Sequence, residues 1–446
     1  MNSGSGGSVP VRSVPAVPLP LSPARGRFSR FVRRSHEQGG LVVQPRMGFA
    51  DTATMRRGLE AVRAVRGASI GTVTVDSYTR VNDHDSARRA LDRGDDLNGY
   101  PVVAHGVQET RRLLTGVADD DFPVQFRHGS ALPRELFGAL ARVGADATEG
   151  GPVSYCLPYS RVPLPQATAA WAECCRILAD RPETMHLESF GGCMLGQLCP
   201  PSLLIALSVL EGMFFREHGM RSISVSYAQQ TSPEQDLEAL AALRLLAAQW
   251  LGDDVDWHVV LYTYMGVFPR TPVGAYRMLE DSVRLAVRSG TERLIVKTAV
   301  EAYRIPTIEE NVDALEFAAA VAADERRAAP VGGAVRQTGI YEEALQLITS
   351  TLRFGDDVGS ALVGAFAHGY LDVPYCLHQD NANRSRAAID PGGTLRWFDP
   401  GAMPVAASDG HGSAPVTARS LIDMLGYNER RFDREQLVGA AVRGIL

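Results

Sequence analysis

A strand–helix alternation that repeats from Leu41 onward is the feature that most restricts the fold of this chain. Short segments rich in β-branched or apolar residues are separated by segments whose apolar residues recur at helical spacing. Strands separated by helices of roughly 10–20 residues form βαβ units, so the alternation predicts a parallel sheet. The nine candidate strands are Leu41–Pro45, Gly71–Val75, Pro101–Val103, Val124–Phe126, Ala145–Thr148, Met185–Leu187, Ser222–Ser226, Trp257–Tyr262 and Leu294–Val296.

About eight repeats within roughly 260 residues match the size of a (β/α)8, or TIM, barrel. Such a barrel has eight places for nine candidate strands, so we expect Pro101–Val103 to lie outside it. The clearest helical segments are Met55–Val65, Pro133–Val143, Gln166–Leu178, Pro201–His218, Pro233–Trp250 and Val273–Ser289. The predicted fold class is therefore α/β, a TIM barrel.

The two ends of the chain differ from this pattern. Residues 1–36 contain Gly, Ser, Pro and six arginines but no Asp or Glu, a composition that cannot bury a core. Past Pro306 the pattern becomes mainly helical, with an irregular stretch rich in Gly, Pro and Asp from Leu371 to about Ala414. We expect a disordered tail over 1–37, a barrel domain over 38–330 and a mainly helical extension over 331–446, packed on the barrel.

Composition excludes several classes of partner. A net charge of −6 and the lack of a basic stripe argue against nucleic-acid binding. No apolar run reaches the ~18 residues that a membrane helix needs. The cysteines show no metal-ligand spacing, so we expect buried, reduced thiols and a cytoplasmic protein without a bound metal of its own. They are Cys156, Cys174, Cys175, Cys193, Cys199 and Cys376.

Charged or polar residues follow most of the candidate strands. Each single arginine is best explained as a surface residue, but the carboxyl ends of all strands in a parallel barrel share one face. We therefore expect the set to converge on the mouth of the barrel. Its members are Arg46, Asp76, Arg80, Arg127, His128, Glu149, Glu188, Tyr227 and Lys297.

This set suits an acidic amino acid. Guanidinium groups bind carboxylates in a bidentate way, so the three arginines indicate a substrate with two carboxylates. Glu149 would bind a substrate ammonium, and Tyr155 and Tyr159 would add neutral hydrogen bonds. No phosphate-binding glycine loop or Ser-His-Asp order is present, and Asp83-His84-Asp85 reads as a solvated loop rather than a metal site.

Lys297 is the only lysine among 45 basic residues. Since arginine is accepted at every other basic position, this site needs a compact or titratable ammonium. A lysine at the end of a barrel strand, with its pKa lowered by burial, is also where a Schiff-base nucleophile lies. A Lys297 aldolase is thus an alternative, although it leaves the three arginines and Glu149 unexplained.

Short motifs around these residues follow one another from about Leu41 to Asp399. Together they resemble the large (epsilon, or E) subunit of glutamate mutase, also called methylaspartate mutase, an adenosylcobalamin-dependent isomerase. The motifs are Gln44-Pro45-Arg46, Asp76-Ser77-Tyr78-Thr79-Arg80, Leu97-Asn98-Gly99-Tyr100-Pro101, Arg127-His128-Gly129, Glu149-Gly150-Gly151, Ser154-Tyr155, Pro158-Tyr159, Phe190-Gly191, Met265-Gly266, Phe268-Pro269 and Ile295-Val296-Lys297-Thr298.

The resemblance implies roles for individual residues. Arg46, Arg80 and Arg127 would bind the two carboxylates of L-glutamate, with His128 beside them. Glu149 would hold the amino group, Tyr155 and Tyr159 would complete the pocket, and Arg80 and Glu149 would be central to catalysis. The residues implied to contact cobalamin and its adenosyl group are Gly48, Asn98, Pro158, Phe268, Lys297, Glu301 and Ile305.

The implied reaction is a radical rearrangement of L-glutamate to threo-3-methyl-L-aspartate. The resemblance also implies a separate small (sigma, or S) subunit that carries most of the cobalamin, and a homodimer of large subunits within a heterotetramer. The small subunit's Asp-x-His-x-x-Gly motif is absent: Asp409-Gly410-His411 begins like it, but Ala414 replaces the glycine.

Some positions depart from the family pattern. Tyr262-Thr263-Tyr264 stands where the family has His-Gln-Trp, and Val267 replaces a glycine. These changes leave the three arginines intact. They also leave open a non-catalytic or altered-substrate mutase subunit.

Overall fold

The central element of the computed structural model is one sheet of eight parallel strands. The structure describes residues 11–13, 22–194, 198–328, 334–407 and 416–442. The sheet has the order β2-β9-β8-β7-β6-β5-β4-β3, and a parallel bridge between Val43 and Ser69 brings its two edges together. The strands are β2 (Val42–Gln44), β3 (Gly71–Thr74), β4 (Val124–Arg127), β5 (Ala147–Gly150), β6 (His186–Ser189), β7 (Ser222–Ala228), β8 (Asp256–Tyr262) and β9 (Arg293–Ile295).

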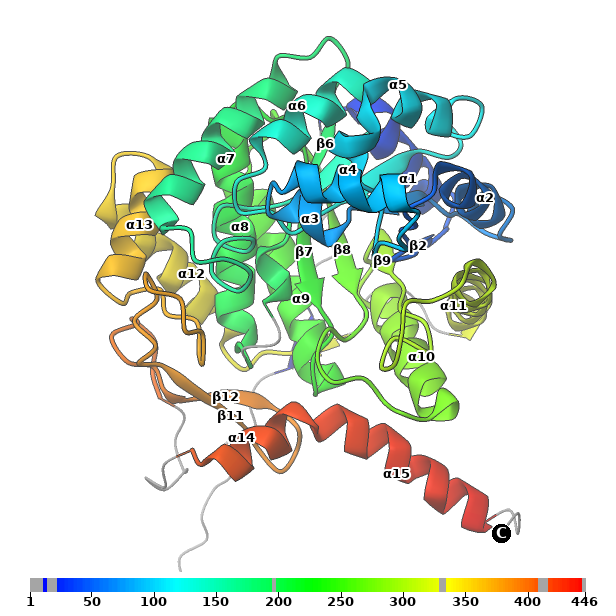
Figure 1. Ribbon diagram of the computed structural model, residues 1–446. Helices are drawn as coiled ribbons and strands as arrows, with labels where there is room; N and C mark the ends of the chain where they lie inside the picture. The colour runs from blue at the N-terminus through cyan, green and yellow to red at the C-terminus, as the bar shows by residue number, and fades with distance from the viewer. Residues whose placement is uncertain (1–10, 14–21, 195–197, 329–333, 408–415, 443–446) are drawn as a thin grey trace, which may run out of the picture.

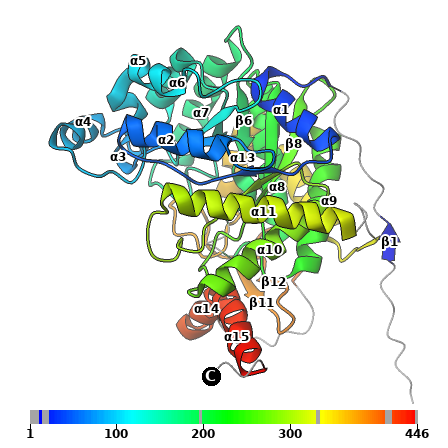
Figure 2. The ribbon, with the colours of Figure 1, turned by 90° about the vertical axis from the view of Figure 1, so that its right-hand side faces the viewer.

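A ring of helices surrounds these strands (Figure 1). In Figure 2, α11 lies between α2 and α10 and so completes the ring. The eight helices are α2 (Thr52–Arg63), α5 (Val102–Leu114), α6 (Arg134–Val143), α7 (Leu164–Ala179), α8 (Pro201–Glu217), α9 (Pro233–Trp250), α10 (Pro272–Arg288) and α11 (Ile308–Ala328). The predicted (β/α)8 barrel is confirmed.

The ninth candidate strand lies outside the barrel, as expected. Pro101 is the N-cap residue of α5, and only Tyr100 forms an isolated bridge, with Val75. Two short helices, α3 (Ser77–Arg80) and α4 (His84–Arg93), precede this segment. Asp76 caps α3 by accepting hydrogen bonds from the backbone N–H groups of Tyr78 and Thr79.

Helix α1 (Gly26–Glu37) covers the amino ends of the strands. Phe28, Phe31 and Val32 are buried, and Phe28 stacks on His186 at a centroid distance of 4.8 Å. The prediction of disorder is therefore wrong over 26–37, because this apolar stripe finds a surface on the barrel. Strand β1 (Val11–Ser13) pairs antiparallel with β10 (Ala334–Arg336). The other residues of the predicted tail, 1–10 and 14–21, lie outside the described residues.

The C-terminal extension packs on the outside of the barrel. Helix α12 (Ile340–Thr351) contacts α8 and α9, and α13 (Val358–Ala367) contacts α7. A 3-10 turn (Leu352–Phe354) joins these two helices. A hairpin of β11 (Arg386–Ile389) and β12 (Leu395–Asp399) and a helix α14 (Ala418–Leu425) follow.

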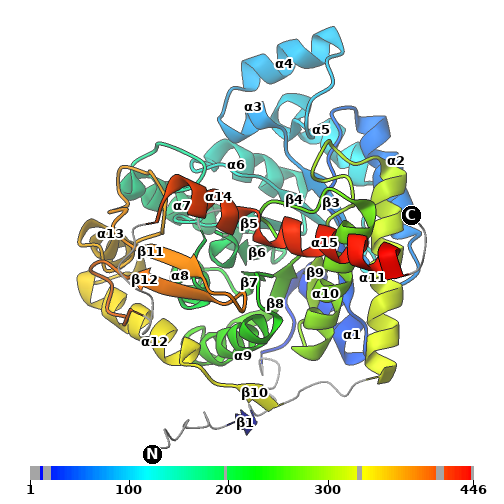
Figure 3. The same ribbon diagram turned by 90° about the horizontal axis from the view of Figure 1, so that it is seen from below.

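Helix α15 (Tyr427–Val442) packs against α10 and crosses the lower end of the molecule (Figure 3). Asp433 accepts hydrogen bonds from the backbone N–H groups of Arg270 and Thr271, which lie in the loop after β8. Asn428 donates to the backbone carbonyl of Gln230, in the loop after β7. The extension thus reaches the loops at the carboxyl ends of two strands.

The prediction of buried thiols is confirmed. All six cysteines are free and buried, and burial raises the pKa of the Cys174 thiol to about 12. None of the helices in the described part of the chain is long and apolar enough to cross a membrane.

We predict that Phe28→Ala lowers the free energy of unfolding by about 3–5 kcal/mol, because the ring is 1% exposed and its removal leaves a cavity. The measurement is urea unfolding. Arg30→Ala on the same helix is the matched control: its contact with Asp120 is exposed, so a loss below about 0.5 kcal/mol is expected. Equal losses in both variants would contradict the proposed packing of Phe28.

Candidate active site

A cavity of about 760 Å³ opens at the carboxyl ends of the strands. All seven residues predicted to bind substrate line it: Arg46, Arg80, Arg127, His128, Glu149, Tyr155 and Tyr159. Of the seven predicted cofactor contacts, Gly48, Asn98, Glu301 and Ile305 line it, whereas Pro158, Phe268 and Lys297 are not among its lining residues. Side chains that lie far apart in the sequence thus share one space.

Arg127 and Glu149 form an ion pair at the base of this cavity. Nε of Arg127 donates to Oε2 of Glu149 at 2.7 Å, and the two side chains are only 5% and 1% exposed. The hydroxyl of Tyr155 donates to the other carboxylate oxygen, Oε1. Burial lowers the pKa of Arg127, but the Glu149 carboxylate together with Tyr262 and Tyr155 outweighs burial, and the pKa of the arginine is raised. The ion pair and the Tyr155 hydroxyl therefore hold the Glu149 carboxylate in one orientation.

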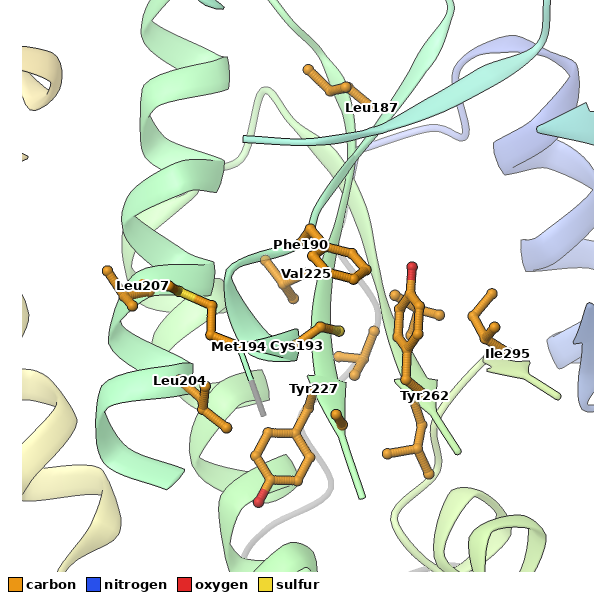
Figure 4. Close-up of a cluster of buried hydrophobic side chains, with 14 of the residues drawn as sticks. Leu187, Phe190, Cys193, Met194, Leu204, Leu207, Val225, Tyr227, Tyr262 and Ile295 are labelled. Atoms are coloured by element: carbon orange, nitrogen blue, oxygen red, sulfur yellow. The ribbon is translucent and has the colours of Figure 1, made fainter. Parts of the chain in front are cut away.

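Tyr262 extends this pair into the barrel. Its hydroxyl lies 2.9 Å from Oε2 of Glu149, accepts from Nη2 of Arg127 at 3.3 Å and also contacts the Glu188 carboxylate. Glu188 in turn pairs with Arg293, and both are completely buried. Figure 4 shows Tyr262 rising from the end of β8 beside Phe190, whose ring centroid is 5.4 Å away. The hydroxyl of Tyr262 is thus the link between two buried carboxylates.

The other two arginines differ in their partners. Arg46 pairs with Glu301 at 2.5 Å, and both are partly exposed at the mouth. Arg80 donates through Nε to the backbone carbonyl of Val75 at 3.0 Å and, within the described residues, has no carboxylate partner. Burial lowers the pKa of Arg80. A half-buried guanidinium whose terminal nitrogens have no carboxylate partner among the described residues is suited to binding an anion.

His128 supplies a neutral donor. Its Nδ1 accepts a hydrogen bond from the backbone N–H of Ser130 at 3.1 Å, so the ring hydrogen lies on Nε2. Nε2 is buried and has no partner among the described residues. Burial lowers the pKa of His128 to about 3, so the ring is uncharged at neutral pH. The ring is held by stacking on Trp171 at a centroid distance of 5.9 Å.

The loop after β9 forms one side of the mouth. Nζ of Lys297 lies 4.7 Å from the centroid of the Phe268 ring, and burial lowers its pKa to about 8. Glu301 Oε2 and Thr298 Oγ1 are buried without a partner among the described residues. The side chain of Ile305, by contrast, is 53% exposed. This loop therefore combines buried polar atoms that have no partner among the described residues with an exposed apolar side chain.

Comparison with known proteins identifies the family. The family model described as methylaspartate mutase E chain matches residues 22–420. The chain belongs to this methylaspartate mutase E chain family. The resemblance read from the motifs is confirmed, and the chain is a subunit of a carbon-skeleton isomerase.

Similar relatives agree with this assignment. The glutamate mutase epsilon subunit of Haloarcula marismortui is 31% identical over 389 residues, which cover 84% of this chain and 78% of the relative. The epsilon subunit of Desulfitobacterium hafniense is 31% identical over 402 residues (86% and 82%). That of Yersinia enterocolitica is 29% identical over 401 residues (86% and 82%).

Sequence reasoning missed part of this mutase-family site. Glu188 was placed at a strand exit but given no role, and Tyr262 was treated only as a departure from the family pattern. Both point into the barrel, and Arg293 lies at the start of β9, away from the exits. Each of the three occupies a strand position whose side chain faces inward, and this alternation was the signal that could have found them. Their mutual contacts, however, depend on how the three strands pair.

We predict that the pKa of Lys297 is about 8, well below its ordinary value of 10.5, because burial disfavours the ammonium. Since the folded chain loses this proton first, its stability should rise with pH from about 8 to 10.5. Lys297 is the only lysine, so ¹³C-lysine labelling gives one NMR signal to follow with pH. Lys297→Arg removes and assigns this signal, and a midpoint near 10.5 would contradict the burial of the amine.

Proposed function

We propose that this chain is the catalytic large subunit of glutamate mutase and rearranges L-glutamate to threo-3-methyl-L-aspartate. The observation that carries the proposal is the charge of the cavity. Its charged lining residues are Arg46, Arg80, Arg127, Glu149, Glu301 and Arg304. Arg304 pairs with Glu310, which does not line the cavity. The remaining three cations and two anions leave a net charge of +1, which complements the −1 of L-glutamate.

The arginines would bind the two substrate carboxylates. Arg80 can accept one without losing an existing ion pair, since it has no carboxylate partner among the described residues. Arg127 is oriented by Glu149, and Arg46 stands at the mouth. The neutral Nε2–H of His128 adds a donor that brings no further charge. Binding both ends of the substrate holds its carbon skeleton in one orientation, which favours a rearrangement over side reactions.

Glu149 would bind the substrate ammonium. Its carboxylate already accepts from Tyr155, Arg127 and Tyr262, so it cannot rotate away from the cavity. Anchoring the amino group beside the carboxylates places the part of glutamate that migrates. Burial also keeps water from the reacting carbon atoms.

We also propose that adenosylcobalamin binds at the mouth of the cavity. Glu301 Oε2 and Thr298 Oγ1, which have no partner among the described residues, would suit ribose hydroxyl groups, and the exposed Ile305 would suit an apolar ring system. When bound, this cofactor supplies the carbon radical that starts the rearrangement. The residues that would hold it are Gly48, Asn98, Pro158, Phe268, Lys297, Glu301 and Ile305.

The family name implies a multi-subunit mutase, so this chain works with a partner. We propose a small subunit that binds most of the cobalamin, within a heterotetramer that contains two large subunits. Within the described residues, no group of three or more His, Cys, Asp or Glu side chains could hold a metal. The segment Asp409-Gly410-His411 lies outside the described residues.

Reconstitution tests the proposal. This chain, a cobalamin-binding small subunit, adenosylcobalamin and L-glutamate are mixed, and methylaspartate is followed by proton NMR. Product that requires all components is the expected result. Conversion of glutamate without cobalamin, with a borohydride-trapped adduct on Lys297, would instead support the Schiff-base alternative. No turnover in a well-formed complex would overturn the proposal in favour of a silent or altered-substrate subunit.

We predict that Arg80→Ala lowers kcat/KM for L-glutamate by about 100-fold or more, because a buried substrate carboxylate loses its charged partner. Steady-state kinetics of the reconstituted complex measure this. Arg88→Ala is the control, since Arg88 pairs with Asp85 on the exposed face of α4 and does not line the cavity, and its activity should be unchanged. Full activity of Arg80→Ala would show that Arg80 does not bind the substrate.

A further inference from the structure

Glu211 is a buried carboxylate that no part of the proposed mechanism uses. It lies on α8, outside the barrel strands, and is completely buried. Among the described residues it has no cationic partner; instead it accepts four hydrogen bonds. Oε1 accepts from the backbone N–H groups of Val153 (3.1 Å) and Ser154 (2.8 Å), and Oε2 accepts from the hydroxyls of Ser154 and Ser189 (3.0 Å each).

The donors belong to the segments that carry the substrate site. Val153 and Ser154 directly precede Tyr155, whose hydroxyl orients Glu149. The segment from Gly151 is a helical turn, in which the N–H of Tyr155 donates to the carbonyl of Gly151. The first N–H groups of such a turn have no partner within it, and Glu211 satisfies two of them from another helix. Ser189 precedes Phe190, which also lines the cavity.

Gly151 and Glu211 are sterically matched. A Cβ atom at Gly151 would lie 2.0–2.2 Å from the carboxylate atoms of Glu211, which is closer than any packed pair of atoms allows. Only glycine at this position leaves room for the carboxylate under the turn. The adjacent Gly150 has a φ of +130° and is closed in by Trp171 and Tyr155. The turn therefore has one position relative to α8.

We infer that Glu211 is a positioning residue for the reaction: it fixes the Gly151–Tyr155 turn so that Tyr155 holds Glu149 toward the substrate amino group. This inference rests on the proposed function. Glu211 touches neither the cavity nor Glu149, so it acts through the backbone of the turn. Burial raises the pKa of Glu211 to about 7, and the four donors favour its carboxylate form.

The test compares Glu211 with a second buried carboxylate. Asp236 on α9 is also completely buried, and burial raises its pKa to about 7 as well. It accepts from the hydroxyl of Tyr227 and the backbone N–H of Gln230, neither of which lines the cavity. Asp236→Asn therefore controls for general destabilisation. The variants are Glu211→Ala, Glu211→Gln and Gly151→Ala.

Two readouts are used on the full reconstituted complex: KM for L-glutamate, and amide hydrogen exchange of peptides covering 151–157. We expect Glu211→Ala and Gly151→Ala to raise KM about tenfold, as for the loss of one hydrogen bond to a charged group, and to speed exchange in this segment. Glu211→Gln keeps one acceptor oxygen, so both effects should be smaller. Asp236→Asn should change neither readout.

Unchanged KM and exchange in Glu211→Ala, or an equal rise of KM in Asp236→Asn, would overturn the inference. If Glu211→Ala does not fold, Glu211→Gln is compared with Asp236→Asn by the same two readouts, and that comparison decides whether Glu211 is a positioning residue. A wild-type complex that does not turn over glutamate would overturn the proposed function instead. Hydrogen exchange would then still decide whether Glu211 fixes the turn.

Discussion

The buried ion pair between Arg127 and Glu149 is the interaction on which the carboxyl end of this barrel depends. Removing two charges from water is unfavourable unless the remaining hydrogen-bonding positions are filled. Here the neighbouring strands β4 and β5 place the two side chains together, and Tyr155 and Tyr262 fill the other positions of the carboxylate. The surrounding residues are therefore constrained by this pair: a tyrosine must come from the turn after β5, and another from the end of β8.

The pair is continued by polar contacts through the barrel. Tyr262 contacts Glu188, Glu188 pairs with Arg293, and Arg293 also donates to Gln44 at 2.6 Å. The guanidinium of Arg293 lies 5.1 Å from the centroid of the Phe28 ring on α1. TIM barrels usually fill this space with branched apolar side chains. In this chain a series of hydrogen-bonded polar side chains, here called the interior ladder, runs from the cavity through Tyr262 to Arg293 and the Phe28 ring at the opposite end, so the position of Glu149 is tied to the whole barrel.

The charges at the mouth serve a different purpose. Within the described residues, Arg80 has no carboxylate partner and Glu301 Oε2 and Thr298 Oγ1 have no hydrogen-bond partner, whereas the interior ladder is paired. Buried polar groups in folded proteins normally find partners, so those that do not mark the places where a ligand is needed. The division between a satisfied interior and an unsatisfied mouth is consistent with a carbon-skeleton mutase, whose protein part must hold a charged substrate and cofactor without reacting itself.

The sequence by itself determined the barrel and the face on which the site lies. Period-3.6 helices between short strands specify a parallel barrel, and a residue directly after a strand must stand at its carboxyl end. For that reason Arg46, Arg127 and Glu149 could be placed at one mouth, and the motifs around them identified the family. Helix α1 was missed because its apolar stripe of Phe28, Phe31 and Val32 is short and lies within an acid-free, arginine-rich segment.

Only the tertiary structure decided which side chains pair with one another. It pairs Arg127 with Glu149 and Arg46 with Glu301, joins Arg80 to the backbone carbonyl of Val75, and brings Glu211 from α8 under the turn after β5. These contacts join residues that are 22 to 255 positions apart in the chain. They depend on the register between strands and on how each helix is rotated against the sheet. Local periodicity carries no information about either, so the same sequence pattern is compatible with many different pairings.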